Sequence, residues 1–579
     1  MTRRPVSLAK TPVPRADQGT ETTRHLCTGT YLDRTLRRTV LRDVLHDRRH
    51  RVAPSYGFDL VAVAHHAWHA WRLEAVQHAW VWTVLLATTA LNRSAGAAVL
   101  CFAGLRLAGG AIVRLAPEAV AYQLKTFAQR HLHLHPTFGD RRDENRLQER
   151  KRLLQVAVGA FFALTAAPFL LAKSTGTPIG LMLAEAALAL LLIATATGLV
   201  AALRDRSIAR LAHRTRPETL NRRLRAIERQ QSHTVVVYQR SRPKEPDEDG
   251  PLPARDKGEK EPHCFVGSGE LVHRWLPPLA IQLLRPKKDS LSKDSAADDM
   301  PAREYVTPPF QAHRLVDHLR SAMRPIGHSS DPIRLPGYHV WDRVFVAEPD
   351  VPSALVPPDS AIDQHTLNKI IDEPYGAMQH FLEICATSSG ELVTTVFLRV
   401  TLKGRSLSLD FAACALARTT EEYQRPGGAA RDGLGDLARS ALAGVCRSPA
   451  EMAGALRLAA APLALARAWR ARSAPAVAPA TAPVYRLREA TACAWEDAAL
   501  DRPMILDQMK IIELRLLKAT EDFLDDHDVD TSVFAKRAET IISASVLNMG
   551  GRVDISNSAV GDNAQMTMNM SDPVPEATP

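Results

Sequence analysis

Residues 181–203 constrain the fold more than any other stretch, because these 23 residues contain no Lys or Arg and only one acid, Glu185. An α-helix rises about 1.5 Å per residue, so roughly 20 apolar residues cross the ~30 Å hydrocarbon core of a bilayer. A buried helix in a soluble protein rarely needs apolar side chains on every face over this length. The stretch therefore predicts a membrane-spanning helix.

Three further apolar runs precede it. Residues 153–172 carry no charge and are separated from residue 181 only by a polar turn, while two weaker runs lie upstream and are joined by three residues. Basic residues gather before residue 76, between 114 and 152, and after 203, and positive charge is retained on the cytoplasmic side. We therefore expect a multi-pass protein of the plasma membrane with both termini cytoplasmic, and with four transmembrane helices at about 76–91, 95–113, 153–172 and 181–203.

The regions that flank these spans are basic, in a chain whose net charge is +10. Residues 1–75 are expected to form a cytoplasmic N-terminal region, and residues 204–230 a juxtamembrane helix near anionic lipid headgroups. Nucleic acid is not expected as a partner, because aromatic side chains are not interleaved with these charges. The seven cysteines are scattered without a C-x-x-C pair, which is typical of a reducing compartment.

Short β-prone runs between residues 231 and 425 predict a cytoplasmic α+β domain. Strands are expected at 233–239, 264–269 and 339–348. The strongest pattern is residues 391–416, where apolar residues alternate on two arms and Lys403-Gly404 supplies a hairpin turn.

The remainder of the chain reads as helical segments and a tail. Residues 429–473 are rich in Ala and Leu with recurring Arg, which fits either an interfacial helix on anionic lipid or a docked helical hairpin. Residues 484–547 are expected to form C-terminal helices. Residues 548–579 are punctuated by Gly and Asn and are β-prone.

Patterns that would indicate chemistry are incomplete. The sequence has no Walker A motif, no G-x-S-x-G and no kinase set. His131, His133 and His135 alternate without a Cys or carboxylate at metal-ligand spacing. Residues 525–537 lack the Gly and the final Glu of an EF-hand loop. We therefore expect no catalytic activity, no metal and no cofactor.

Three segments behind the apolar runs carry a resemblance. FVGSGELVHRWLPPLAIQLLRP (265–286), YHVWDRVFVAE (338–348) and ELVTTVFLRVTLKGRSLSLDF (391–411) resemble a group of uncharacterised actinobacterial four-span integral membrane proteins. The resemblance covers most of residues 75–425 and implies architecture and a membrane location, but no activity. Its motifs read as structural, with turn residues at Gly267 and Gly269 and core residues at Trp275 and Phe345.

The tail carries a second resemblance. Residues 523–570 are similar to C-terminal segments of actinobacterial signalling and defence proteins, some of which contain amyloid-like signalling motifs. The residue order departs from that of the best-known motif, although alternating apolar residues, a Gln/Asn ladder and low net charge suit cross-β stacking. A small terminal hairpin or a disordered tail is an equal alternative. The candidate partner-binding residues are Val560, Gly561, Asp562, Asn563, Gln565 and Met566.

Three classes of function remain open from the sequence. The first is a membrane-anchored signalling or defence component that recruits a partner, or self-associates, through its cytoplasmic domain and tail. The alternative is a structural or scaffold membrane protein. A channel or transporter has less support, because only Glu185 and Arg106 are charged within the expected spans.

Overall fold

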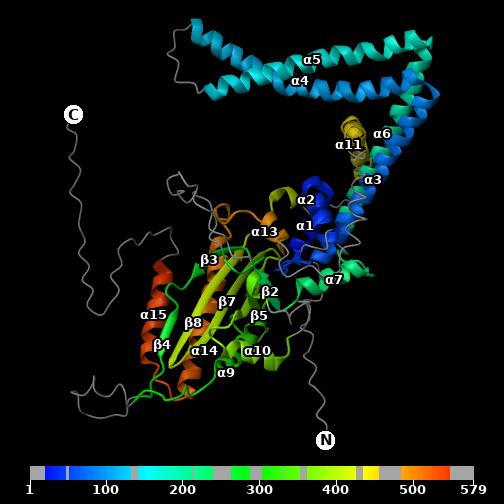
Figure 1. Ribbon diagram of the computed structural model, residues 1–579. Coiled ribbons are helices and arrows are strands. Elements are labelled where there is room, and N and C mark those ends of the chain that lie inside the picture. The colour runs from blue at the N-terminus through cyan, green and yellow to red at the C-terminus, as the bar shows by residue number, and fades with distance from the viewer. Residues whose placement is uncertain are drawn as a thin grey trace, which may run out of the picture.

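The computed structural model describes residues 20–46, 51–131, 141–211, 214–238, 263–286, 303–328, 330–351, 362–424, 434–455 and 484–547. Within these ranges the chain forms a set of long helices and a mixed β-sheet covered by shorter helices (Figure 1). It begins with α1 (Glu21–Leu32), α2 (Arg34–Thr39) and the π-helix η1 (Val40–His46).

Four long helices form what we call the bundle: α3 (Leu60–Leu91), α4 (Arg93–His131), α5 (Arg141–Thr175) and α6 (Ile179–Arg210). Polar caps set where the first two begin, since Asp59 accepts from the N–H of Val61 and Asn92 from the N–H of Ser94, both at 3.0 Å. Figure 1 shows α3 and α6 extending away from the sheet, and α4 and α5 side by side as one long hairpin that turns off at their far ends and runs across their direction.

Three helical segments are long and apolar enough to cross a membrane: Arg93–Val113, Arg152–Thr175 and Ile179–Arg210. They correspond to three of the four expected spans. The fourth, 76–91, forms the second half of α3 but does not reach this hydropathy, because Gln77 and His78 interrupt its apolar run.

A seven-stranded sheet confirms the expected α+β fold. Its strands run in the order β2-β5-β6-β7-β8-β3, with β4 also paired to β8, and only the β2–β5 pair is parallel. The strands are β2 (Val235–Tyr238), β3 (Glu270–Arg274), β4 (Leu279–Gln282), β5 (His339–Ala347), β6 (Met378–Ser388), β7 (Leu392–Lys403) and β8 (Ser406–Leu416).

The sheet includes one correction to the expected strands. Residues 264–269 form a turn and not a strand, because Gly267 and Gly269 adopt φ of +91° and +98°, which is incompatible with extended backbone. The β7–β8 hairpin, in contrast, has the expected turn, with Gly404 at φ +60° and Lys403 opposite Ser406.

Helices from two parts of the sequence cover one face of the sheet. They are α9 (Ala312–Met323), α10 (Gln364–Asp372), α14 (Arg502–Asp526) and α15 (Ser532–Leu547). Buried residues of α14, such as Leu516 and Phe523, share one hydrophobic core with Leu398 and Phe411 of the hairpin. We call the sheet and these four helices the sheet domain.

The opposite face of the sheet is aromatic. The rings of Phe265 and Phe397 stack at 4.2 Å, and Phe345 and Phe381 meet Phe265 edge to face. Tyr56, from the segment that leads into α3, packs in the same cluster. The segment that leads into the bundle therefore packs on this face of the sheet.

Helix α11 (Leu434–Ala455) docks on the bundle. A Cβ on Gly444 would lie 2.8 Å from the carbonyl oxygen of Thr197, so the backbones of α11 and α6 are in close contact. The indole N–H of Trp82 also donates to the carbonyl oxygen of Ala455 at 2.9 Å. Of the two alternatives for residues 429–473, the described part is a docked helix.

Short elements complete the chain. Helix α7 (Arg222–Gln231) follows α6 after a break, in place of one continuous helix over 204–230. β1 (Arg51–Val52) pairs in parallel with β9 (Val484–Tyr485), and α13 (Leu487–Thr491) follows β9. The remaining short helices are η2 (Arg324–Gly327), η3 (Glu348–Asp350), η5 (Glu421–Tyr423) and η8 (Trp495–Asp497).

Candidate functional site at the junction of the bundle and the sheet domain

The N-terminal end of α1 lies against the turn that joins β6 to β7. The N–H and the hydroxyl of Thr22 both donate to the carbonyl oxygen of Gly390, at 3.2 and 3.0 Å. Gly390 adopts φ of +67°, and a Cβ there would lie 2.9 Å from Cγ of Glu21. Glycine therefore permits the close approach of α1 to this turn.

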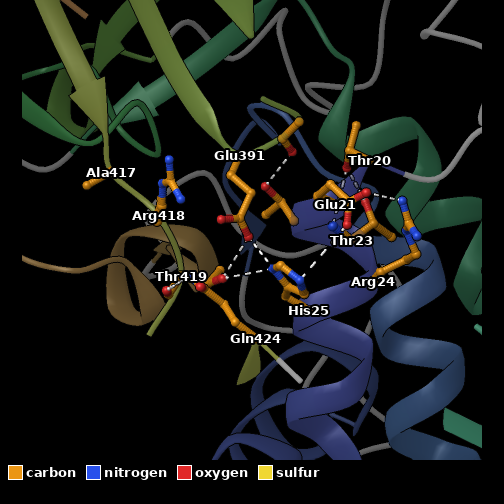
Figure 2. Close-up of polar contacts among 12 residues, drawn as sticks. Thr20, Glu21, Thr23, Arg24, His25, Glu391, Ala417, Arg418, Thr419 and Gln424 are labelled. Atoms are coloured by element: carbon orange, nitrogen blue, oxygen red, sulfur yellow. Dashed lines mark hydrogen bonds and ion pairs between the residues drawn. The ribbon is translucent and has the colours of Figure 1, made fainter. Parts of the chain in front are cut away.

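Next to this turn, Figure 2 shows His25 of α1 directed at the carboxylate of Glu391. The hydroxyl of Thr419 donates to the same carboxylate at 3.0 Å. Burial raises the pKa of Glu391, but hydrogen bonds from His25 and Thr419 and the charge of His25 outweigh burial, so the pKa lies below its ordinary value. The group is held as a carboxylate, which is the form that accepts both hydrogen bonds.

Arg488 of α13 also contacts Glu391, at the adjoining ends of β7 and β8. Its Nη2 donates to the backbone oxygens of Glu391 and Ala417, at 2.9 and 2.6 Å. The residue is 1% exposed, and burial lowers the pKa of its guanidinium to about 10. Since these two carbonyls border β7 and β8, Arg488 fixes the ends of the two strands relative to each other.

Glu489, the next residue, fills the glycine turn before β3. Its Oε1 accepts from the N–H groups of Gly267 and Gly269, at 2.8 and 3.2 Å. Successive N–H groups at positive φ form a small concavity that favours an anion. Here the anion is a carboxylate of the same chain, so the turn serves to position α13.

The other end of the N-terminal helices is joined to the bundle by ion pairs. Arg34 contacts Glu74 of α3 at 3.1 Å and Glu451 of α11 at 2.5 Å. Arg37 also pairs with Glu74, and its side chain is only 2% exposed. His78 lies 3.7 Å from Glu451. We call these five residues the bundle contact, and Thr22, His25, Gly390, Glu391 and Thr419 the sheet contact.

A second link between bundle and sheet lies below α3. The hydroxyl of Tyr56 donates to Glu383 of β6 at 2.9 Å, and Nε of Arg343 on β5 donates to the same carboxylate oxygen at 2.8 Å. Glu383 is fully buried, and Arg343 is 4% exposed. Removing one partner of this cluster would leave an uncompensated buried charge. The cluster therefore holds the segment before α3 against the sheet.

A hydrogen-bonded chain also joins α1 to the near end of α3. Nε2 of His66 lies 3.0 Å from the carbonyl oxygen of Thr215, so it must donate. Nδ1 of a neutral His66 then accepts from the hydroxyl of Tyr31, at 3.0 Å, and His69 lies 3.3 Å from that hydroxyl. Burial and the neighbouring His65 lower the pKa of His66 to about 4, so its imidazole is neutral.

The residues singled out from the sequence have different fates. Gly267 and Gly269 are turn residues, and Trp275 and Phe345 are buried at 4% and 1% exposure, as expected. The tail candidates between Val560 and Met566 lie outside the described residues. No group of three or more His, Cys, Asp or Glu that could hold a metal ion occurs in the part of the chain that the structure describes.

No sequence pattern indicates the two contacts. His25 and Glu391 are 366 residues apart, and Arg34 and Glu451 are 417 residues apart, so no local spacing connects either pair. The one local clue is Ser389-Gly390 after an alternating apolar run, which is typical of a turn.

Comparison with known proteins gave one family match, which covers part of the chain. Residues 278–556 match the model of a family described as AbeC-like domain. The match begins just before β4, includes α11 and continues past α15, and it covers just under half of the chain. It contains Glu391, Glu451 and Arg488 but not the N-terminal helices or the bundle. Neither the curated proteins nor the solved structures yielded a match.

Proposed function

We propose that the protein is a non-catalytic, multi-pass protein of the plasma membrane that acts as a membrane-anchored signalling or defence component. Anchoring is supported by the exposed surface of the bundle, where large apolar side chains face outward. Phe162 and Leu170 of α5 and Leu199 of α6 are 62–67% exposed. In a soluble monomer such a continuous apolar surface would be unfavourable, whereas lipid chains would cover it.

Helix α3 has the same inverted pattern, which supports it as a fourth span. Its polar Gln77 and His78 are buried at 3% and 5% exposure, while Val76, Leu86 and Leu91 are 65%, 62% and 86% exposed. With four spans, the N-terminal helices and the sheet domain lie on one side of the membrane. The distribution of Lys and Arg supports the cytoplasm as that side.

The observation that carries a signalling role is the position of α1 and α2. This pair of helices is hydrogen-bonded to the sheet domain through the sheet contact and ion-paired with α3 and α11 through the bundle contact. A shift of α3 or α11 would therefore displace α1 and act on the β6–β7 turn. Such an element can pass a change in the bundle to the sheet domain.

In this proposal the sheet domain and the tail recruit a protein partner or a second copy, and the tail supplies the assembly step. A non-catalytic role is supported by the polar groups of the junction, whose acceptors are taken up by the chain itself. Glu391 accepts from Thr419, and Glu489 fills the glycine turn. Neither carboxylate is left open to a substrate.

Hydrogen exchange on the full chain in lipid nanodiscs tests the coupling. Arg34→Ala removes both ion pairs of Arg34, and we expect faster amide exchange in the β6–β7 turn, some distance from the substitution. Arg214→Ala is the matched control, because its partner Glu218 is on the same exposed segment. If Arg34→Ala leaves exchange in the turn unchanged, the domain is a passive scaffold on its anchor.

A further inference from the structure

The near end of α3 presents two stacked tryptophans on its outer face. The ring centroids of Trp68 and Trp71 lie 4.8 Å apart with 25° between the ring planes. The ring centroid of His46 of η1 lies 6.1 Å from that of Trp68. Although indole is one of the largest apolar side chains, the two residues are 40% and 36% exposed. They continue the exposed apolar stripe of α3 toward the sheet domain, one to two turns before Val76.

The packing of α3 on α6 gives the depth of this pair. The indole N–H of Trp80 donates to the carbonyl oxygen of Leu192 at 3.3 Å, which sets these two residues level. The helices run in opposite directions, so twelve residues back along α3 (80 to 68) and twelve forward along α6 (192 to 204) reach the same level. Trp68 therefore lies level with Arg204, the first charge after the apolar run of α6.

The exposed charges at this level are basic, whereas Asp205 of α6 is half-buried and accepts a hydrogen bond from Ser440 of α11. Arg72 of α3 and Arg206 and Arg210 of α6 are exposed. Glu74, the one acid of α3, is turned inward to Arg34 and Arg37. An exposed surface that combines indole rings with arginines, at the level where a charge-free run ends, has the chemistry of the interfacial zone of a bilayer.

We propose that Trp68, Trp71 and Arg72 form a binding surface for the headgroup layer of the inner leaflet, with a preference for anionic phospholipid. The indoles lie among the headgroups and glycerol groups, and Arg72 pairs with lipid phosphate. The proposal rests on the membrane anchoring proposed above. It adds where the membrane surface meets α3 and which lipid that surface selects.

Depth-dependent quenching of fluorescence tests the position. The full chain is placed in nanodiscs that contain phosphatidylcholine brominated either near the headgroup or near the chain end. Subtracting the emission of W68F/W71F from that of the wild type isolates the pair, and W80F isolates Trp80. Trp80 is 46% exposed and lies nine residues beyond Trp71, or about 13 Å deeper. We expect shallow bromines to quench the pair more strongly and deep bromines to quench Trp80 more strongly.

The results separate the two proposals. If Trp80 is quenched and the pair is quenched by neither lipid, the headgroup surface is wrong while membrane anchoring stands. If Trp80 is not quenched either, α3 does not enter the bilayer.

For lipid choice, brominated phosphatidylglycerol diluted in phosphatidylcholine should quench the pair more than the same fraction of brominated phosphatidylcholine. Arg72→Gln should lower this excess by up to about fivefold, the effect of one basic residue near a membrane surface. Equal quenching by both lipids in the wild type would overturn the anionic preference.

Discussion

The bundle and the sheet domain use the same apolar residue types in opposite ways. In the sheet domain Phe397 is fully buried and stacks on Phe265, and the core of β6, β7 and β8 excludes solvent. In α5 only 11% of the most apolar stretch within Arg152–Thr175 is buried, and Phe162 is 67% exposed. The difference supports the proposal that the two regions have different surroundings, water around one and an apolar medium around the other.

Polar residues reverse in the same manner. Inside the bundle, Asn92 and Ser94 are buried and hydrogen-bonded to each other at 2.6 Å, close to the turn between α3 and α4. In the sheet domain, Arg274 and Asp410 lie on the surface, where they pair at 3.2 Å. A buried polar group requires a hydrogen-bond partner in either region. The regions differ in their outer surfaces, which carry large apolar side chains in the bundle and ion pairs in the sheet domain.

The comparison is tested most strongly by truncating one phenylalanine in each region. We expect Phe397→Ala to lower the free energy of unfolding of the sheet domain by about 3–5 kcal/mol, because it opens a cavity in a packed aromatic cluster. Phe162→Ala should change the stability of the bundle by less than about 1 kcal/mol, because its side chain makes few protein contacts. Denaturant titration in micelles, followed by near-UV circular dichroism and by hydrogen exchange in each region, gives both values.

Equal losses for the two variants would break the comparison. That outcome would mean that the surface around Phe162 is covered by protein, for example by a second copy, and is not in contact with lipid.

The second prediction concerns the sheet contact between the two regions. Glu391→Ala removes the acceptor shared by His25 and Thr419, and we expect a loss of about 1–3 kcal/mol from unsatisfied buried donors. Glu391→Gln keeps an acceptor oxygen and should lose less. Thermal unfolding of the full chain in nanodiscs measures both. If the two variants are equal, the hydrogen bonds of this carboxylate do not hold α1 on the sheet.

How far the sequence predicts the fold depends on the range of each signal. The apolar length of residues 153–172 and 181–203 is a local property, and both segments are long apolar helices in the structure. The alternation in residues 391–416 predicted the hairpin and its turn at Gly404 for the same reason. The apolar pattern of residues 264–269 wrongly predicts a strand, whereas the turn expected at Gly267 and Gly269 is confirmed by their positive φ.

The residue pairs of the candidate site cannot be predicted from local sequence patterns. His25 is one of several histidines near the N-terminus, and neither its charge nor its neighbours indicate a partner in β7. The same holds for Glu451, which reads as a surface charge in an Ala-rich segment but contacts Arg34. Such pairs depend on how distant elements pack together, and local patterns in one sequence do not reveal that packing.

The third prediction is a pH dependence at the near end of α3. Because burial lowers the pKa of His66 to about 4 from its ordinary 6.5, the unfolded chain binds the proton more readily than the folded chain between these values. The stability contributed by neutral His66 is therefore complete above pH 6.5 and is lost as pH falls from 6.5 toward 4. Thermal midpoints of the wild type and His66→Gln at pH 7.5 and pH 5 test this, and the wild type should lose more. A drop of the same size in both would assign the effect to other groups.

The smallest expected effect comes from an ion pair that belongs to neither buried surface. Arg214 and Glu218 are four residues apart, pair at 2.7 Å, and are each 79% exposed. Water screens such a pair, and holding two long side chains in place costs entropy, so Arg214→Ala should change the free energy of unfolding by less than about 0.5 kcal/mol. High salt should remove even that difference. Arg37→Met is the informative contrast, because Arg37 makes the same kind of pair with Glu74 at 2% exposure, and its loss leaves a partly buried carboxylate at the bundle contact. If Arg214→Ala proves as damaging as Arg37→Met, then the segment after α6 is not an exposed linker, and a partner or the membrane surface covers it.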